Sequence, residues 1–190
     1  QGLTLRDSVY LSYLLQLRSK HTFRAGFEQT NSGDDDLITR QIGFIRLPSQ
    51  QNYHLYYGSP SPAEFSFNLR TDYFQEGEHD WASKIEFKTT SYFTDRIRLN
   101  ANYTYIDSDD WLIGNIDGQV SRYSRRLNML YAKLIARLSE NSDVTITTQW
   151  YGLKAKGIAG QSADVAHGED FNVSRFALQA RYRKMFDNGS

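Results

Sequence analysis

Apolar and polar side chains alternate with a period of two along most of the chain. Near the start, Leu11, Tyr13 and Leu15 share one parity, and Ser12 and Gln16 take the other. The same alternation recurs over 63–73, 81–89, 96–106, 130–138, 144–151 and 175–182. A period of two predicts β-strands that have one apolar and one polar face.

Ten strands are predicted from this pattern. They cover 3–17, 21–29, 38–47, 51–57, 63–74, 80–89, 95–106, 123–138, 143–154 and 171–184. Several are longer than the five or six residues that are common in globular proteins. They reach the nine to eleven residues that a tilted strand needs to cross a bilayer.

The connections also differ in length. Thr90–Asp95 and Ser139–Asp143 are predicted to be tight turns, whereas Asp107–Arg122 and Ala155–Asp170 are predicted to be long loops. Short turns at one end and long loops at the other are typical of outer-membrane barrels. Asn31–Asp36 interrupts this alternation of short and long connections.

The alternation favours an all-β fold, an antiparallel up-and-down transmembrane β-barrel with about ten strands in this chain. A soluble β-sandwich would show a similar alternation, with the polar parity in solvent. In the barrel, the charged parity lines a wet lumen. The lumen-lining candidates are Glu64, Arg70, Lys84, Glu86, Lys88, Arg96, Arg98, Lys133, Arg137, Arg175 and Arg181. They line a solute-selecting pore, or they interlock and fill a narrow barrel.

Aromatic side chains stand near the ends of the apolar parity. The chain has 13 Tyr, 11 Phe and 3 Trp, although it is polar on average. Rings of aromatic residues flank the lipid-facing band of membrane barrels. The lipid-interface candidates are Trp81, Tyr103, Tyr105, Trp150 and Tyr182. In the sandwich alternative, the same residues form the rim of an apolar core.

Composition narrows the remaining classes. Lys and Arg together number 22 and balance 22 Asp and Glu, so nucleic acid is not an expected partner. The chain lacks cysteine, which excludes disulfides and thiolate zinc sites. No apolar run approaches the 18 or so residues of a membrane helix. The first residues have no signal-peptide pattern, so the numbering is expected to begin at a mature terminus or within a longer chain.

Several ordered stretches resemble one family of unknown function. They are Arg46-Leu-Pro-Ser-Gln-Gln-Asn-Tyr53, Tyr73-Phe-Gln-Glu-Gly77 followed by Trp81, Tyr92-Phe-Thr-Asp95, Tyr103-Thr-Tyr-Ile-Asp-Ser-Asp-Asp-Trp-Leu-Ile113, Gln149-Trp-Tyr-Gly-Leu-Lys-Ala155 and Leu178-Gln-Ala-Arg-Tyr-Arg183. The family joins an N-terminal domain, similar to family-nine carbohydrate-binding modules, to a C-terminal outer-membrane β-barrel. The matches run in order from about residue 40 to 183, so they cover most of the chain.

The resemblance implies that residues 1–190 form one region of such a barrel. No stretch resembles the carbohydrate-binding domain, so sugar binding is not carried over to any residue. The family's barrel continues past Arg181-Tyr-Arg183 into a final strand, whereas this chain ends at Asp187-Asn-Gly-Ser190. The barrel in this chain is therefore expected to be an incomplete part of a larger one.

Reactive chemistry is sparse. No nucleophile elbow, phosphate-binding glycine loop or dinucleotide fingerprint occurs, so no enzyme activity, catalytic residue or cofactor is expected. The four histidines are scattered without metal-ligand spacing, and no metal site is expected. The acidic runs Asp34–Asp36 and Asp107–Asp110 and the acidic turn around His79 read as hydrated loops.

The expected function is that of an outer-membrane β-barrel of a Gram-negative bacterium, which acts as a porin-like transport component or anchors a carbohydrate-binding domain. Its expected partners are outer-membrane lipid and lipopolysaccharide, with other outer-membrane or periplasmic proteins as further candidates. Two alternatives stay open: a soluble β-sandwich carbohydrate-binding module, and a barrel enzyme that acts on lipid or glycan.

Overall fold

The protein is described from a computed structural model, which covers residues 6–35, 38, 45–60, 64–78, 80–115 and 117–185. The described residues form twelve β-strands and contain no helix that is able to cross a membrane. The strands are β1 (Ser8–Gln16), β2 (Thr22–Thr30), β3 (Gly33–Asp35), β4 (Ile45–Leu47), β5 (Gln50–Gly58), β6 (Phe65–Glu76), β7 (Asp80–Thr94), β8 (Ile97–Gly114), β9 (Val120–Ser139), β10 (Ser142–Ile158), β11 (Val165–His167) and β12 (Phe171–Lys184).

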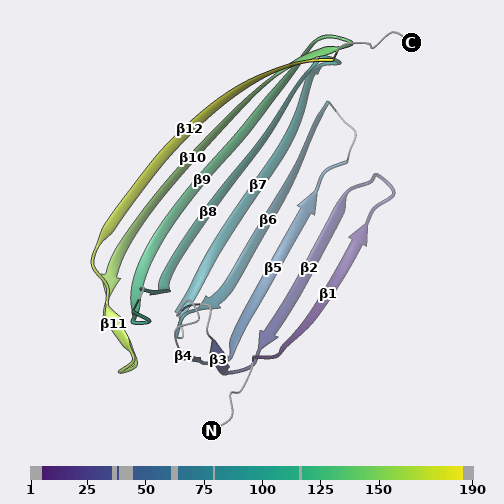
Figure 1. The fold of residues 1–190 in the computed structure, drawn as a ribbon. Helices are drawn as coiled ribbons and strands as arrows, with labels where there is room; N and C mark the ends of the chain where they lie inside the picture. Colours follow the sequence, from purple (N-terminus) through teal and green to yellow (C-terminus); the bar gives the residue numbers. More distant parts are fainter. Residues whose placement is uncertain are drawn as a thin grey trace.

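One curved sheet dominates the structure (Figure 1). Its strands lie in the order β1-β2-β5-β6-β7-β8-β9-β10-β12, and each pairs antiparallel with its neighbours. The short strand β11 pairs parallel with β9, while β3 and β4 form a separate two-stranded sheet. Within the described residues, β1 and β12 are the two edges and do not pair, so the sheet is not closed into a barrel.

The connections at the two ends of the sheet differ less than the sequence predicted, because β7 runs to Thr94, β10 runs to Ile158 and the β6–β7 connection at the mouth is short. At one end, called the turn end, residues 95–96 and 140–141 link the strands by tight turns. At the other, called the mouth, the β2–β5 connection carries β3 and β4, and the β10–β12 connection carries β11. Residues 31–35 therefore begin the long mouth connection between β2 and β5, and Gly33–Asp35 of this stretch form β3 rather than a hydrated loop.

Nine of the ten predicted strands correspond to strands of the large sheet, and the predicted strand 38–47 does not. Ile38 lies in a turn, 39–44 fall outside the described residues, and β4 pairs only with β3. The tenth strand of the large sheet is instead β11. Local alternation predicts an extended segment but does not specify which sheet the segment joins.

The predicted loop Asp107–Arg122 is wrong in most of its length. β8 runs to Gly114 and β9 begins at Val120, so the two strands form a long hairpin. The pairing shifts by one residue between Ser108 and Trp111, where β8 carries a bulge. The acidic run 107–110 has the composition of a loop, but cross-strand arginines on β9 neutralise it in the sheet.

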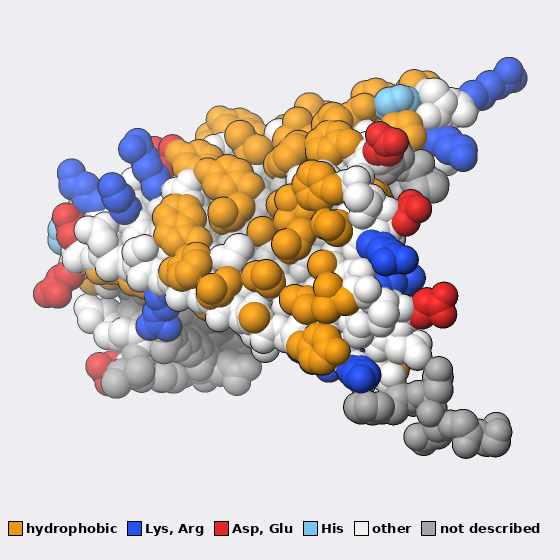
Figure 2. All heavy atoms as spheres, turned by 90° about the horizontal axis from the view of Figure 1, so that it is seen from above, with side chains coloured by type: hydrophobic (Ala, Val, Ile, Leu, Met, Phe, Trp, Pro, Cys, Tyr) orange, Lys and Arg blue, Asp and Glu red, His pale blue; other side chains and the backbone are white. Residues whose placement is uncertain are grey.

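The two faces of the sheet have opposite chemistry. One face carries Leu11 and Tyr13 of β1, which remain 65% and 69% exposed, and the apolar parity continues across the sheet to Leu178 of β12. Figure 2 shows hydrophobic side chains gathered in a broad band on the face in view, with charged side chains toward both ends. No second layer of described residues covers this apolar face.

The polar face is the concave one. Arg125 of β9 and Glu76 of β6 are three strand steps apart, yet Arg125 Nη2 lies 2.6 Å from Glu76 Oε1. On a flat sheet, three steps separate the backbones by about 14 Å, which is more than the two side chains are able to bridge comfortably. The sheet therefore curves toward its polar face, where Asp72 is only 6% exposed.

The apolar band runs diagonally across the hydrogen-bonded rows. Successive cross-strand pairs link Ser12 of β1 to Val173 of β12. The apolar positions of β1, Val9–Leu15, centre on Ser12. Those of β12, Phe176–Tyr182, centre on Gln179, six residues beyond Val173. The strands are therefore inclined to the band rather than perpendicular to it.

Candidate functional site on the concave face

The concave face gathers most of the charged residues that the sequence singled out. Cross-strand pairing places nine of them there: Arg70, Lys84, Glu86, Lys88, Arg98, Lys133, Arg137, Arg175 and Arg181. The other two, Glu64 and Arg96, lie in connections at the turn end, outside the strands. Their main-chain carbonyls accept hydrogen bonds from Tyr92 N and Arg137 N.

A charged ladder of alternating sign crosses β6 and β7, and it consists of Arg70, Asp72, Lys84, Glu86 and Lys88. Arg70 Nη2 lies 2.7 Å from Asp72 Oδ1, and Lys88 Nζ lies 2.8 Å from Glu86 Oε1. Lys84 approaches the other Glu86 oxygen at 4.0 Å. Each acid in the ladder therefore has a cation beside it, and the ladder is nearly neutral.

A basic patch lies on β8, β9, β10 and β12 toward the turn end, and it consists of Arg98, Lys133, Arg137, Arg181 and Arg183. These side chains surround a hollow of about 320 Å³ whose floor includes Ile135 and Thr145. The one acid that lines the hollow is Asp143, and Arg183 Nη2 donates to it at 2.6 Å. The other four cations have no acidic partner among the described residues, so the patch has an excess of positive charge.

An ion-pair network, called the mouth network, lies at the opposite end of the sheet, and it consists of Glu76, Asp80, Asp110, Arg122 and Arg125. Asp110 is fully buried, and its Oδ1 accepts a hydrogen bond from Arg122 Nε at 2.6 Å. Arg122 also pairs with Asp80. Arg125 reaches Glu76 at 2.6 Å, and its guanidinium lies over the Trp111 ring at 4.6 Å.

The β6–β7 turn is fitted around Asp110. Asp110 Oδ2 accepts hydrogen bonds from Glu78 N at 2.6 Å and Asp80 N at 3.2 Å. Gly77 has a φ of 60°, and a Cβ there would lie 2.1 Å from the Asp110 carbonyl oxygen. Glycine is the residue that meets both requirements without strain. The network therefore locks the turn onto the β8–β9 hairpin.

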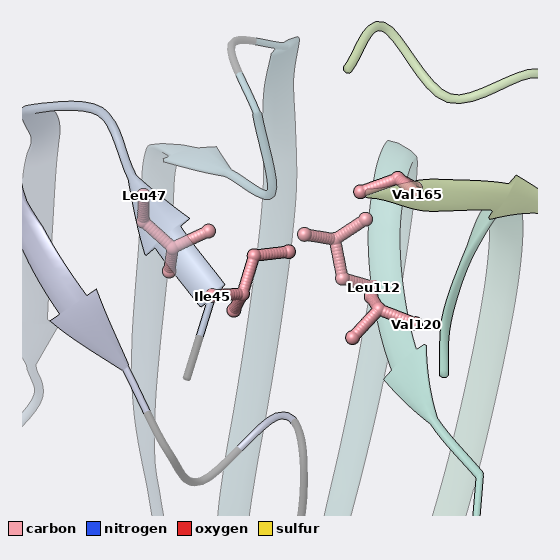
Figure 3. Packing of buried hydrophobic residues seen from close by; sticks show 5 residues of the cluster. All are labelled: Ile45, Leu47, Leu112, Val120 and Val165. Atoms are coloured by element: carbon pink, nitrogen blue, oxygen red, sulfur yellow. The ribbon is translucent and has the colours of Figure 1, made fainter. Parts of the chain in front are cut away.

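A small apolar cluster accompanies this network at the mouth. Figure 3 shows Ile45 and Leu47 of β4 on one side, with Leu112, Val120 and Val165 of β8, β9 and β11 opposite. All five are buried, with at most 7% of each residue exposed. The inserted β3–β4 sheet is thus held against the extended β8–β9 hairpin at the mouth.

The predicted interface aromatics lie on the convex face. Pairing places Tyr103 and Tyr105 of β8, Trp150 of β10 and Tyr182 of β12 there. Trp81 of β7 stacks on Tyr73 with ring centroids 4.4 Å apart. Among the described residues, every member of the apolar band has the parity that was predicted from the sequence.

Sequence reasoning missed part of the concave face. Asp72 and Arg183 follow the same parity as Arg70 and Arg181, so the alternation would have found them. Asp110 is different because it lies in the β8 bulge, and Arg122 of β9 has the parity of Leu130 rather than that of Arg125. Only the paired structure reveals that these two residues meet.

The described residues hold no group of three or more His, Asp and Glu side chains arranged for a metal ion. His79 lies outside the described residues. Comparisons with protein-family models, curated proteins and solved structures found no match for the chain. The resemblance to the barrel family with a carbohydrate-binding domain therefore remains a prediction from its sequence stretches.

Proposed function

We propose that this chain forms part of the wall of an outer-membrane β-barrel whose concave face lines a water-filled passage for solutes. The observation that carries the proposal is the convex face, where a band of large apolar side chains is exposed and crosses the sheet diagonally. Lipid acyl chains are the occupant that fits such a band, because they need no shape-matched partner.

The dimensions of the band support this assignment. On β8 the band runs from Ile97 to Tyr105, which is roughly 26 Å along the strand at about 3.3 Å per residue. From β1 to β12 the centre of the band shifts by six residues, which is roughly 20 Å along the strands. The steps between neighbouring strands add up to roughly 38 Å over the same path, so the strands are inclined by roughly 30°. Barrel strands tilt by about 35–45°, and their apolar band is about 25 Å tall.

The aromatic rings of the convex face support the same assignment. Tyr53, Tyr73 and Trp81 form a stacked group toward the mouth, with Tyr53 and Trp81 centroids 6.1 Å apart. Tyr182 lies at the other limit of the band, near the turn end. Amphipathic rings at both limits are favoured where hydrocarbon meets water, since one end of each side chain is apolar and the other polar.

The unpaired edges support a barrel of more than nine strands. β1 and β12 expose their backbone donors and acceptors, which have no partner in hydrocarbon unless another strand pairs with them. We infer that further strands complete the wall. A wider barrel leaves an aqueous channel, whereas side chains fill a barrel of about eight strands.

The soluble β-sandwich is the less favoured function class. A sandwich buries its apolar face against a second sheet about 10 Å away. In the described residues, the separate sheet is only β3 and β4, and it packs at the mouth rather than over the convex face. An apolar face of this extent on a soluble monomer is an aggregation liability.

The test is the behaviour of the full chain in lipid. Together with the strands that complete its wall, the chain is expected to refold into phospholipid vesicles and to run on a gel at a position that changes on heating. Its insertion is expected to open an ion conductance in a planar bilayer. A product that stays soluble without detergent and shows no heat-dependent mobility would contradict the membrane assignment.

A further inference from the structure

We propose that the basic patch is a binding site for soluble multivalent phosphate groups, such as those of phosphorylated solutes. The inference rests on the proposed function, in that the concave face is taken as the lining of the passage. It goes further because it assigns a ligand class to one end of that lining.

Charge is segregated along the concave face even though the whole chain is neutral. The ladder on β6 and β7 has three cations and two acids, which are paired with each other. The basic patch has five cations around a hollow that Asp143 alone lines with negative charge. The excess is therefore local, and it is not balanced by neighbouring strands.

Strand pairing holds these cations in place. Thr145 of β10 pairs with Ile135 of β9 and with Arg181 of β12, and Arg98 of β8 pairs with Ile135. Arg98 and Arg181 thus lie at the two ends of one row, three strand steps apart, with Ile135 and Thr145 between them. Asp143 in the adjacent row pairs with both Arg137 and Arg183.

The chemistry of the patch fits phosphate better than a single carboxylate. Guanidinium groups present planar forks that bind phosphate oxygens bidentately, and an ammonium adds a point charge. Asp143 engages Arg183, so Arg98, Lys133, Arg137 and Arg181 remain for a ligand. Four cations around one hollow of about 320 Å³ suit a ligand with two or more negative charges.

The test titrates inorganic pyrophosphate into the full chain refolded in detergent micelles and follows the heat of binding. We expect saturable binding that weakens as salt is added. The Lys133→Gln/Arg181→Gln double variant is expected to lose about tenfold or more in affinity, as charge-assisted contacts are removed. The matched control, Lys84→Gln/Lys88→Gln, removes the same charge from the ladder on β6 and β7 and is expected to bind as the native chain does.

Equal loss in both double variants, or no saturable binding to the native chain, would overturn the proposal. The source of the phosphate is tested by competition. Displacement of pyrophosphate by a soluble sugar phosphate supports the proposal, whereas displacement by a short-chain phosphatidate alone overturns it in favour of a lipid headgroup.

A bilayer recording separates this proposal from the proposed function. Pyrophosphate binding without any conductance would support the binding site and contradict the proposed passage. The opposite result is a conductance whose reversal potential favours cations in a KCl gradient, with no pyrophosphate binding. That result would contradict the binding site and support the passage. The native chain provides both measurements, so a double variant that fails to refold does not prevent the test.

Discussion

Individual residues on the concave face are fitted closely to one another, and Gly26 illustrates this. His54 stacks on Tyr10 and shares a 2.9 Å hydrogen bond with the Tyr10 hydroxyl. A Cβ on Gly26 would lie 2.1 Å from His54 Cε1. The His54 ring is only 7% exposed, so it has little room to yield.

Gly26→Ala is therefore expected to lower the free energy of unfolding by about 1–3 kcal/mol, as overpacking does in tight sites. Urea titration of the refolded chain measures the change. In a His54→Ala background, the same substitution is expected to be neutral, because the clashing ring is gone. An equal loss in both backgrounds would show that the His54 contact is not the cause.

A second residue-scale prediction concerns Asp110. Asp110→Asn removes the charge that faces Arg122 in a buried pair, and a loss of about 3 kcal/mol is expected. The control is Asp107→Asn on the same strand, where the pair with Arg126 is 3.6 Å apart and solvent-exposed. That variant is expected to lose less than about 1 kcal/mol. Similar losses in both variants by urea titration would contradict a special role for the mouth network.

Among the strands, the sequence predicts best where alternation is unbroken. The long strands β6, β9, β10 and β12 follow a parity that fixes both faces, because a slip of one residue would place the whole apolar set in water. Two expectations are wrong for a shared reason: that the predicted strand 38–47, of which β4 is a described part, belongs to the large sheet, and that 107–110 is a loop. Each depends on pairing with another strand, β3 for β4 and β9 for 107–110. The alternation within one segment does not specify which other strand will pair with it.

Strand β10 offers a matched test of the two faces. Thr147 and Thr148 are adjacent, partly buried and identical in type, but pairing places Thr147 on the concave face and Thr148 on the convex face. Thr148→Arg is expected to lower stability in vesicles by about 2–4 kcal/mol, the cost of an arginine near the bilayer midplane. Thr147→Arg points into water and is expected to cost far less. Refolding yield and urea midpoint in vesicles measure both, and a reversed order would contradict the face assignment.

For the whole molecule, the decisive feature is the open sheet, in which β1 and β12 are separate edges. Neither the strand count nor the alternation predicted how far the sheet would curve, because curvature depends on side chains that meet across several strands, such as Arg125 and Glu76. The alternation predicted which charged residues share the concave face. It did not predict that pairing would separate them into the charged ladder and the basic patch.

The open edges make a cross-linking prediction. In the Thr148→Cys/Leu178→Cys variant, the two positions are paired neighbours, so a short thiol cross-linker is expected to join them. In the Tyr13→Cys/Leu178→Cys variant, the positions lie on the opposite edges β1 and β12, and no intramolecular product is expected. An equally efficient cross-link there would show that these strands close on themselves.

The most direct test of the central claim uses the absence of cysteine in the chain. Single cysteines along β10, each labelled with a fluorophore in refolded vesicles, report which face meets lipid. We expect labels at Val144, Ile146, Thr148 and Trp150 to be quenched by brominated acyl chains, and labels at Thr145, Thr147 and Gln149 to be quenched by aqueous iodide. Iodide access at all seven positions, with no lipid quenching, would contradict a membrane-embedded wall.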